Sequence, residues 1–61
     1  MFDEYAVVRA KRDLSPDVPK GTLGTIVMVY DRNVGDYEVE FVDAQGNHKA
    51  LLTVNVVDLE V

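Results

Sequence analysis

The apolar residues of this chain form short runs separated by turn-forming residues, and no segment has the periodicity of an amphipathic helix. The runs are rich in valine, tyrosine, phenylalanine and isoleucine, which favour extended backbone. Five strands are therefore predicted, at residues 5–10, 25–30, 36–42, 48–53 and 57–61.

The segments between these runs have the composition of loops and turns. Residues 11–20 are polar and contain two prolines, so they are predicted to form a long loop. Residues 31–36 and 43–46 carry the Asn, Asp and Gly typical of hairpin turns, and residues 54–56 are expected to form a 3₁₀ turn. The pattern predicts an all-β fold, a small five-stranded SH3-like barrel built as an antiparallel meander, with residues 1–61 as a single domain.

The third predicted strand alternates between apolar and acidic residues. Because side chains alternate across a strand, Tyr37, Val39 and Phe41 are expected to face the core. Glu38 and Glu40 then face solvent, about 7 Å apart along the strand. They form an exposed acidic stripe, which keeps the protein soluble and discourages unwanted strand pairing.

The second predicted strand is apolar on both faces, so its buried face is left open by the pattern. Either Val27 and Val29 face the core and Ile26, Met28 and Tyr30 face outward, or the reverse holds. A barrel of this size has little room for both sets, and exposed apolar surface usually marks an interface. The competing interpretation is a sheet curled tightly enough to bury both faces of this strand.

The region from Leu51 to Val61 adds further apolar residues. We therefore predict a partner-binding flank built from the second strand and the segment Leu52–Val56, with carboxylates at its rim. Its predicted residues are Met28, Tyr30, Glu38, Glu40, Leu52, Val54 and Val56.

Composition narrows the chemistry that this chain could perform. It has no cysteine and a single histidine, His48, which argues against a disulfide framework or a structural zinc site. Its only serine, Ser15, precedes a proline in the long loop, and nothing in the sequence places it beside His48. We expect no enzyme activity, no catalytic or metal-binding residues, no cofactor and no small-molecule substrate.

Acidic residues outnumber basic ones, eleven to six, which gives a net charge of -5. Such a chain is repelled by phosphate backbones and anionic membranes, so neither is an expected partner. The N-terminal MFDEYAVV lacks a signal-peptide pattern, and the longest apolar run, Ile26–Tyr30, is far shorter than a membrane helix. The expected compartment is the cytoplasm.

Specific similarity begins at residues 20–27, KGTLGTIV, and continues through YEVEFVD at residues 37–43 and Gly46. This pattern resembles a family of small bacterial proteins known only as a domain of unknown function, from about Tyr5 to Leu59. Its GxxGTIV part is shared more loosely with SH3-like barrels, including KOW-type domains of ribosomal and transcription proteins. The resemblance implies a partner-binding role, since members often lie beside other small genes, sometimes in toxin–antitoxin-like pairs.

These observations favour a non-catalytic protein-interaction module of bacterial type, an antitoxin-like or accessory protein that binds a basic partner. One alternative is a self-associating structural domain, in which the same apolar flank binds a second copy. Another is a KOW-like nucleic-acid-binding barrel, which the net charge of -5 disfavours.

Overall fold

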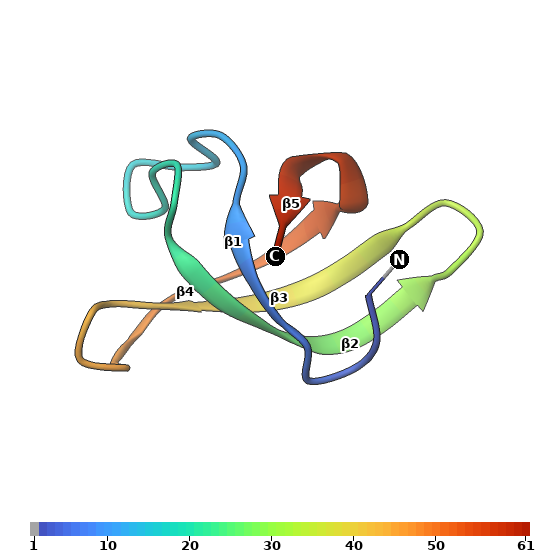
Figure 1. The fold of residues 1–61 in the computed structure, drawn as a ribbon, viewed down its shortest axis with the longest axis horizontal. Coiled ribbons are helices and arrows are strands. Elements are labelled where there is room, and N and C mark those ends of the chain that lie inside the picture. Colours follow the sequence, from blue (N-terminus) through green and yellow to red (C-terminus); the bar gives the residue numbers. More distant parts are fainter. Residues whose placement is uncertain (1) are drawn as a thin grey trace.

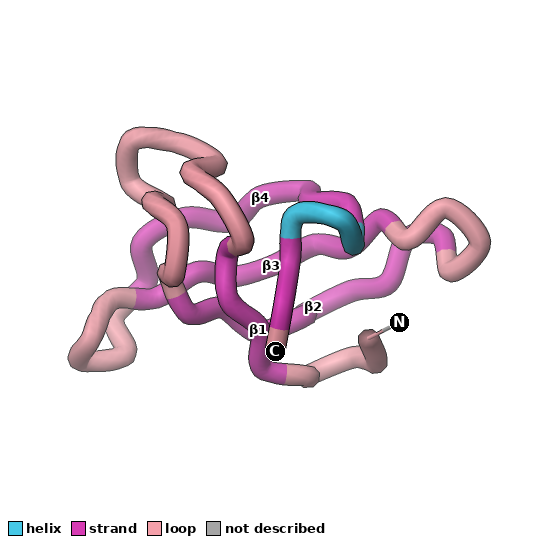
Figure 2. Tube along the Cα trace, turned by 45° about the horizontal axis from the view of Figure 1, so that its top comes forward, coloured by secondary structure: helices cyan, strands magenta, loops and turns pink. Residues whose placement is uncertain are grey.

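The structure, a computed structural model, describes residues 2–61 and contains an antiparallel sheet of five strands in the order β4-β3-β2-β1-β5 (Figure 1). The long strand β2 bends, so that β1 and β5 cross over the face of the other strands and the sheet curls into a half-barrel (Figure 2). The predicted all-β, SH3-like meander is confirmed. Its elements are β1 (Val7–Ala10), β2 (Leu23–Asp31), β3 (Asp36–Val42), β4 (His48–Asn55), the 3₁₀ turn η1 (Val56–Asp58) and β5 (Leu59–Glu60).

The strand boundaries differ from the predicted ones where tertiary pairing extends or ends a strand. Strand β3 has its predicted bounds, whereas β4 continues to Asn55, which pairs with Asp36 of β3. The 3₁₀ turn is displaced accordingly, from residues 54–56 to Val56–Asp58. Strand β1 begins only at Val7, after Tyr5, whose φ of 69° interrupts extended backbone.

The core lies on the concave side of the curled sheet. Tyr37, Val39 and Phe41 of β3 are fully buried there, as predicted from their alternation. Burial of side chains of this size contributes roughly 1.5–3 kcal/mol each. The long loop contributes Val18, which a bridge between Ser15 and Val18 folds back toward the sheet. The other buried apolar residues are Val8, Ala10, Ile26, Val54 and Leu59.

A β-bulge decides which face of β2 is buried. Ile26 pairs with Val39 and Met28 pairs with Glu38, so Val27 is an extra residue between two neighbouring pairs. Both predicted assignments were wrong because they assumed unbroken alternation. Ile26 is fully buried, and after the bulge it is the half-buried Val29 that packs against the core. Met28 and Tyr30 are exposed.

The N-terminal segment packs against the same core. The ring of Phe2 meets that of Tyr37 edge to face, with centroids 5.9 Å apart. The Phe2 backbone N–H donates a hydrogen bond of 3.0 Å to the Tyr37 hydroxyl. The segment is held to β2 by the N–H of Ile26, which donates to the carbonyl of Ala6 at 2.9 Å. Tyr37 therefore buries its ring and still has a hydrogen-bond partner.

Asn55 joins three segments at one end of the sheet. Its side-chain amide donates to the carbonyl of Val34 at 3.0 Å and to the carboxylate of Asp36 at 2.8 Å. Its side-chain oxygen accepts from the N–H of Val57 at 3.1 Å and so caps η1. One side chain thus ties the β2–β3 loop, β3 and η1 together.

We predict that Asn55→Ala lowers the free energy of unfolding by about 1–2 kcal/mol, because it removes a cap and two further hydrogen bonds. Urea denaturation measures this loss. Asn33→Ala is the matched control, since Asn33 is exposed and only its backbone N–H bonds to Asp31. Equal stability of the two variants would contradict the role of Asn55.

Gly24 of β2 pairs with Phe41 of β3, close to core side chains of that strand. A Cβ at this position would lie 2.7 Å from Cγ1 of Val39 and 2.8 Å from Cδ1 of Phe41. Gly24→Ala is therefore expected to lower the free energy of unfolding by about 1–3 kcal/mol through overpacking. Thermal denaturation beside the adjacent, half-buried Thr25→Ala tests this. An unchanged melting temperature in the Gly24 variant would show that the core yields freely at this point.

Candidate functional site

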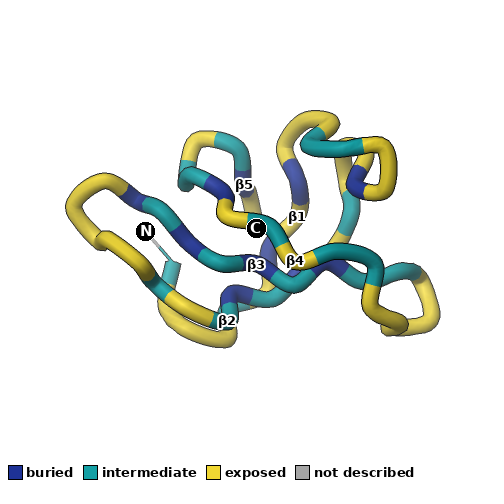
Figure 3. Tube along the Cα trace, turned by 180° about the vertical axis from the view of Figure 1, so that it is seen from behind, coloured by how far each residue is buried: buried dark blue, intermediate teal, exposed yellow. Residues whose placement is uncertain are grey.

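The outer face of the sheet, defined here as the solvent-facing side of β2, β3 and β4, carries the largest group of predicted partner-binding residues. The register places Met28 of β2 beside Glu38 of β3 and Thr53 of β4, and it places Glu40 beside Leu51. Strand β3 alternates along its length between buried and half-buried positions, whereas the end of β2 is largely exposed (Figure 3). The outer face is thus a continuous surface that crosses three strands.

Apolar side chains flank this face on both sides of β3. Met28 is 49% exposed and Tyr30 is 53% exposed on β2, while Leu51 on β4 is 51% exposed. Each keeps about half of its side chain in water, although the core nearby is fully packed. Large apolar side chains grouped in this way are more typical of an interface than of ordinary surface.

A stripe of carboxylates runs along β3 between these apolar flanks. Glu38 accepts a hydrogen bond of 2.9 Å from the hydroxyl of Thr53, and a carboxylate oxygen of Glu40 lies 3.0 Å from Nδ1 of His48. Thr53 carries no charge, so its bond orients the Glu38 carboxylate without neutralising it. Within residues 2–61, neither glutamate forms an ion pair with a lysine or arginine.

The arrangement suits binding better than proton transfer. General acid–base catalysis needs a carboxyl group whose burial drives its pKa away from that of a neighbour. In the part of the chain that the structure describes, no polar or charged residue is buried. The half-buried glutamates of the outer face instead offer negative charge and hydrogen-bond acceptors to an approaching surface.

The structure brings together four of the seven predicted partner-binding residues and separates the other three. The register places Met28, Glu38 and Glu40 on the outer face, and Tyr30, two residues beyond Met28, is exposed at a second irregularity of β2 between Val29 and Asp31. The other three, Leu52, Val54 and Val56, belong to β4 and η1.

The prediction that Leu52–Val56 forms an accessible flank was wrong. Val54 is only 5% exposed and pairs with Tyr37, while Leu52 pairs with Val39 and packs against the core. Val56 is half-buried and packs against the core, and its N–H donates to the carbonyl of Gly35 at 2.7 Å. The reason is that β4 continues through Asn55, which carries these side chains inward.

The same alternation adds residues that sequence reasoning missed. If Leu52 and Val54 face the core, then Leu51 and Thr53 must face outward. Both lie within the predicted strand 48–53, but neither was predicted to bind, because the predicted flank took Leu52 as an outward-facing residue. The alternation of inward and outward side chains along this strand was the signal that would have found them.

Two side chains with shifted pKa values lie elsewhere. The Asp58 carboxylate accepts hydrogen bonds of 2.7 and 3.1 Å from Arg12, and this bonding, with the attraction of opposite charge, raises the pKa of Arg12. The pKa of Asp43 is lowered, chiefly because the backbone N–H of Asn47 donates to its carboxylate and the N–H of Gln45 adds to this. Both groups are at the surface and belong to turns and loops.

Within residues 2–61, no helix is long and apolar enough to cross a membrane. In the same part of the chain, no three His, Asp or Glu side chains lie close enough to hold a metal ion.

Fold and surface together define a small SH3-like β module with an acidic and apolar sheet face. The chain belongs to the family described as "Domain of unknown function (DUF4926)", whose model matches residues 4–61. This confirms the resemblance read from the KGTLGTIV and YEVEFVD segments. A search of curated proteins and a search of solved structures each find no match.

The hydrogen bonds to Asp43 predict how stability depends on pH. Because the pKa of Asp43 is lower in the folded protein, its carboxylate stabilises the fold above its unfolded pKa of about 3.9. This contribution is lost as the pH falls through the folded pKa. We expect Asp43→Asn to be less stable than wild type at pH 6, with the difference shrinking below pH 3, as measured by urea midpoints.

Asp17→Asn serves as the control, because Asp17 is exposed in the long loop and its carboxylate accepts no hydrogen bond in the described structure. Its difference from wild type should change little over the same pH range. A constant difference between Asp43→Asn and wild type would contradict the prediction.

Proposed function

We propose that this chain is a non-catalytic protein-interaction module that binds a basic protein through its outer face. The observation that carries the proposal is the pairing of half-exposed apolar side chains with carboxylates that form no ion pair with lysine or arginine within residues 2–61. Met28, Tyr30 and Leu51 would supply buried contact area, and Glu38 and Glu40 would supply charge complementarity.

The carboxylates define the kind of partner that fits. A partner with lysine or arginine around an apolar patch would pair with Glu38 and Glu40 while covering Met28 and Tyr30. Nucleic acid would place phosphates against the same stripe in a protein whose net charge is -5, so the KOW-like alternative is disfavoured. A second copy docked face to face would also bring two acidic stripes together.

An antitoxin-like or accessory role agrees with this surface. The sequence pattern resembles small bacterial proteins that lie beside other small genes, sometimes in toxin–antitoxin-like pairs. A small basic protein encoded nearby would meet the acidic face quickly, since opposite charges steer encounter. Binding would then cover or recruit that partner without chemistry by this chain.

Self-association is the second candidate, and the edge of the sheet favours it. Strand β4 is an edge strand, so the backbone N–H and C=O groups along its outer edge have no partner strand in this sheet. It spans eight residues, His48–Asn55, and its residues after Lys49 include neither proline nor a charged side chain. Edges of this kind accept a further strand, and two copies of β4 could pair antiparallel.

Met28→Glu is expected to abolish capture of the partner by the tagged protein in its native cell, because it places a charge in the centre of the apolar contact. Val57→Glu is the matched control, since Val57 is 70% exposed on η1 and carries the same charge change away from the outer face. Captured proteins are compared by mass spectrometry. A partner retained by both variants would contradict the proposed surface.

The double variant Glu38→Gln/Glu40→Gln is expected to weaken that capture and to reduce its sensitivity to salt.

Light scattering over a hundredfold range of concentration distinguishes binding of a foreign partner from self-association. A monomer agrees with a foreign partner, whereas a dimer that persists in Met28→Glu would favour pairing through β4.

A further inference from the structure

The lysines and arginines of this acidic protein are unevenly distributed. Of its six, Arg9, Lys20 and Lys49 line one surface depression of about 400 Å³. Within residues 2–61, the ion pairs of arginine are those of Arg12 with Asp58 and of Arg32 with Asp3, and both lie outside this depression. None of the three lining cations forms an ion pair there, although the chain has eleven carboxylates.

The three cations come from segments that only the folded chain brings together. Arg9 lies on β1, Lys20 at the end of the long loop and Lys49 near the start of β4. The end of the long loop and the β3–β4 turn lie at the same end of the sheet, opposite the β2–β3 loop (Figure 1). The remaining lining residues are Gly21, Thr22, Leu23, Val42, Asp43 and Ala44.

Gly21 lines the depression without a side chain. Gly21 has a φ of 91°, and no atom from beyond its two chain neighbours lies within 4 Å of the place where a Cβ would stand. The guanidinium of Arg9 reaches across to the carbonyl of Gly21, with a donor–acceptor distance of 3.4 Å. This long contact places the Arg9 side chain at the rim while leaving most of its five N–H groups for another acceptor.

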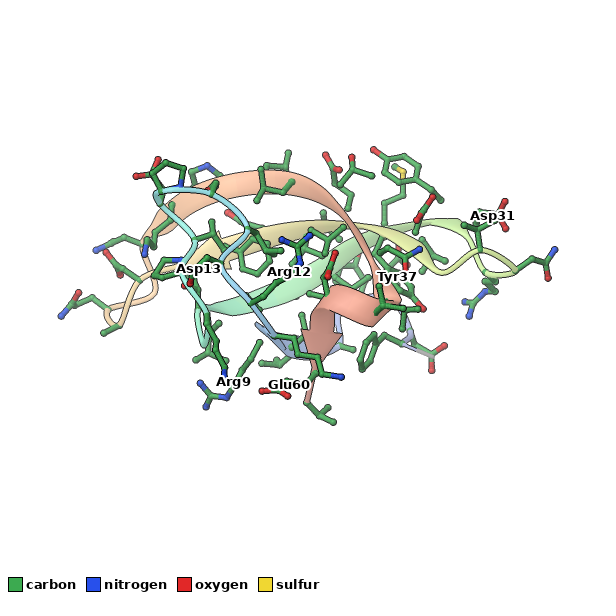
Figure 4. All side chains as sticks on the ribbon, turned by 90° about the horizontal axis from the view of Figure 1, so that it is seen from above. Arg9, Arg12, Asp13, Asp31, Tyr37 and Glu60 are labelled. Atoms are coloured by element: carbon green, nitrogen blue, oxygen red, sulfur yellow. The ribbon has the colours of Figure 1, made fainter. Side chains whose placement is uncertain are left out.

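Two carboxylates lie close to the lining cations without forming an ion pair with them within residues 2–61: that of Asp43 attracts Lys49, and that of Asp13 accepts a hydrogen bond of 2.7 Å from the backbone N–H of Lys20. Asp43 is engaged in its own turn, where the N–H groups of Gln45 and Asn47 each donate to its carboxylate at 2.9 Å. Glu60 of β5 is opposite Arg9 of β1 in the sheet and projects to the same side (Figure 4), but the two form no ion pair. Among the lining residues, cations outnumber carboxylates three to one.

We propose that this depression is a binding site for a single phosphate monoester, with Arg9, Lys20 and Lys49 as its ligands. A phosphate monoester carries a charge of roughly -1.5 to -2 and three acceptor oxygens, enough to engage three cations at once. A carboxylate has two oxygens and one charge. Arginine binds phosphate oxygens in a forked geometry, and lysine adds compact positive charge.

The rest of the molecule limits the ligand to one phosphate. A polyanion would extend beyond the depression over a protein whose net charge is -5, and its other phosphates would be repelled. The volume of about 400 Å³ exceeds that of the phosphate group, and Leu23, Val42 and Ala44 offer apolar contact to whatever the phosphate is attached to. That group is either a free small molecule or a phosphorylated side chain of another protein.

The experiment is an NMR titration of the uniformly ¹⁵N-labelled full chain with inorganic phosphate and O-phosphoserine at constant ionic strength. Saturable shifts are expected at the amides of residues 9, 20–23 and 42–49, and not in the β2–β3 loop. Lys20→Gln/Lys49→Gln should bind about tenfold more weakly or worse, since charge-assisted hydrogen bonds to two cations are lost. Arg32→Gln is the matched control, because it removes one cation at the opposite end of the sheet.

The spectrum of each variant reports directly whether the protein remains folded, and Lys20→Gln alone provides a milder change. Shifts that grow without saturating, or that are equal in the double variant, would overturn the proposal and indicate only screening of charge. Acetate binding as tightly as O-phosphoserine would overturn the assignment to phosphate.

A short neutral peptide with one phosphoserine distinguishes the two sources of the phosphate. Binding at least tenfold tighter than O-phosphoserine would support the site and assign it to a phosphorylated protein. Equal or weaker binding of the peptide, with O-phosphoserine still saturating the site, would support the site and assign it to a free phosphate ester.

Discussion

The bulge at Val27 is the constraint on which both faces of the sheet depend. Strand β2 must pack Ile26 against Val39 near its middle and Val29 against the core further on, and these positions are three residues apart. Regular alternation would place them on opposite faces. One extra residue, Val27, restores the match, so that both pack against the core while Met28 stays in solvent. Tyr30 is also exposed, at a second irregularity between Val29 and Asp31. The apolar part of the outer face is therefore a consequence of how the core is completed.

Carboxylates and cations also occupy different parts of the surface. The outer face carries the carboxylates of Glu38 and Glu40, which β4 orients through Thr53 and His48. Cations concentrate at one end of the sheet, where Arg9, Lys20 and Lys49 line a depression. The partners that we propose for the two surfaces differ accordingly: a basic protein for the outer face and a single phosphate for the depression. A chain of 61 residues can carry both because its core occupies only the concave side of the sheet.

Sequence reasoning worked best where a strand alternates without interruption. Strand β3 was predicted with its observed bounds, with Tyr37, Val39 and Phe41 in the core and Glu38 and Glu40 on the outer side. It failed at β4, because the apolar run from Leu51 onward gives no sign of where the strand ends. Val54 was therefore assigned to a surface flank, although pairing with Tyr37 carries it into the core. Leu51, which faces outward on the same strand, was missed because Leu52 was taken as the outward-facing residue.

The sequence by itself determined the fold class, the family, the acidic character and the stripe on β3, because these follow from local alternation, turn residues and composition. Only the tertiary structure decided the buried face of β2, the inward direction of Val54 and the meeting of Arg9, Lys20 and Lys49. Each of these depends on the register between strands that are distant along the chain. A shift of one residue reverses every side chain beyond it, and the local pattern does not record such a shift.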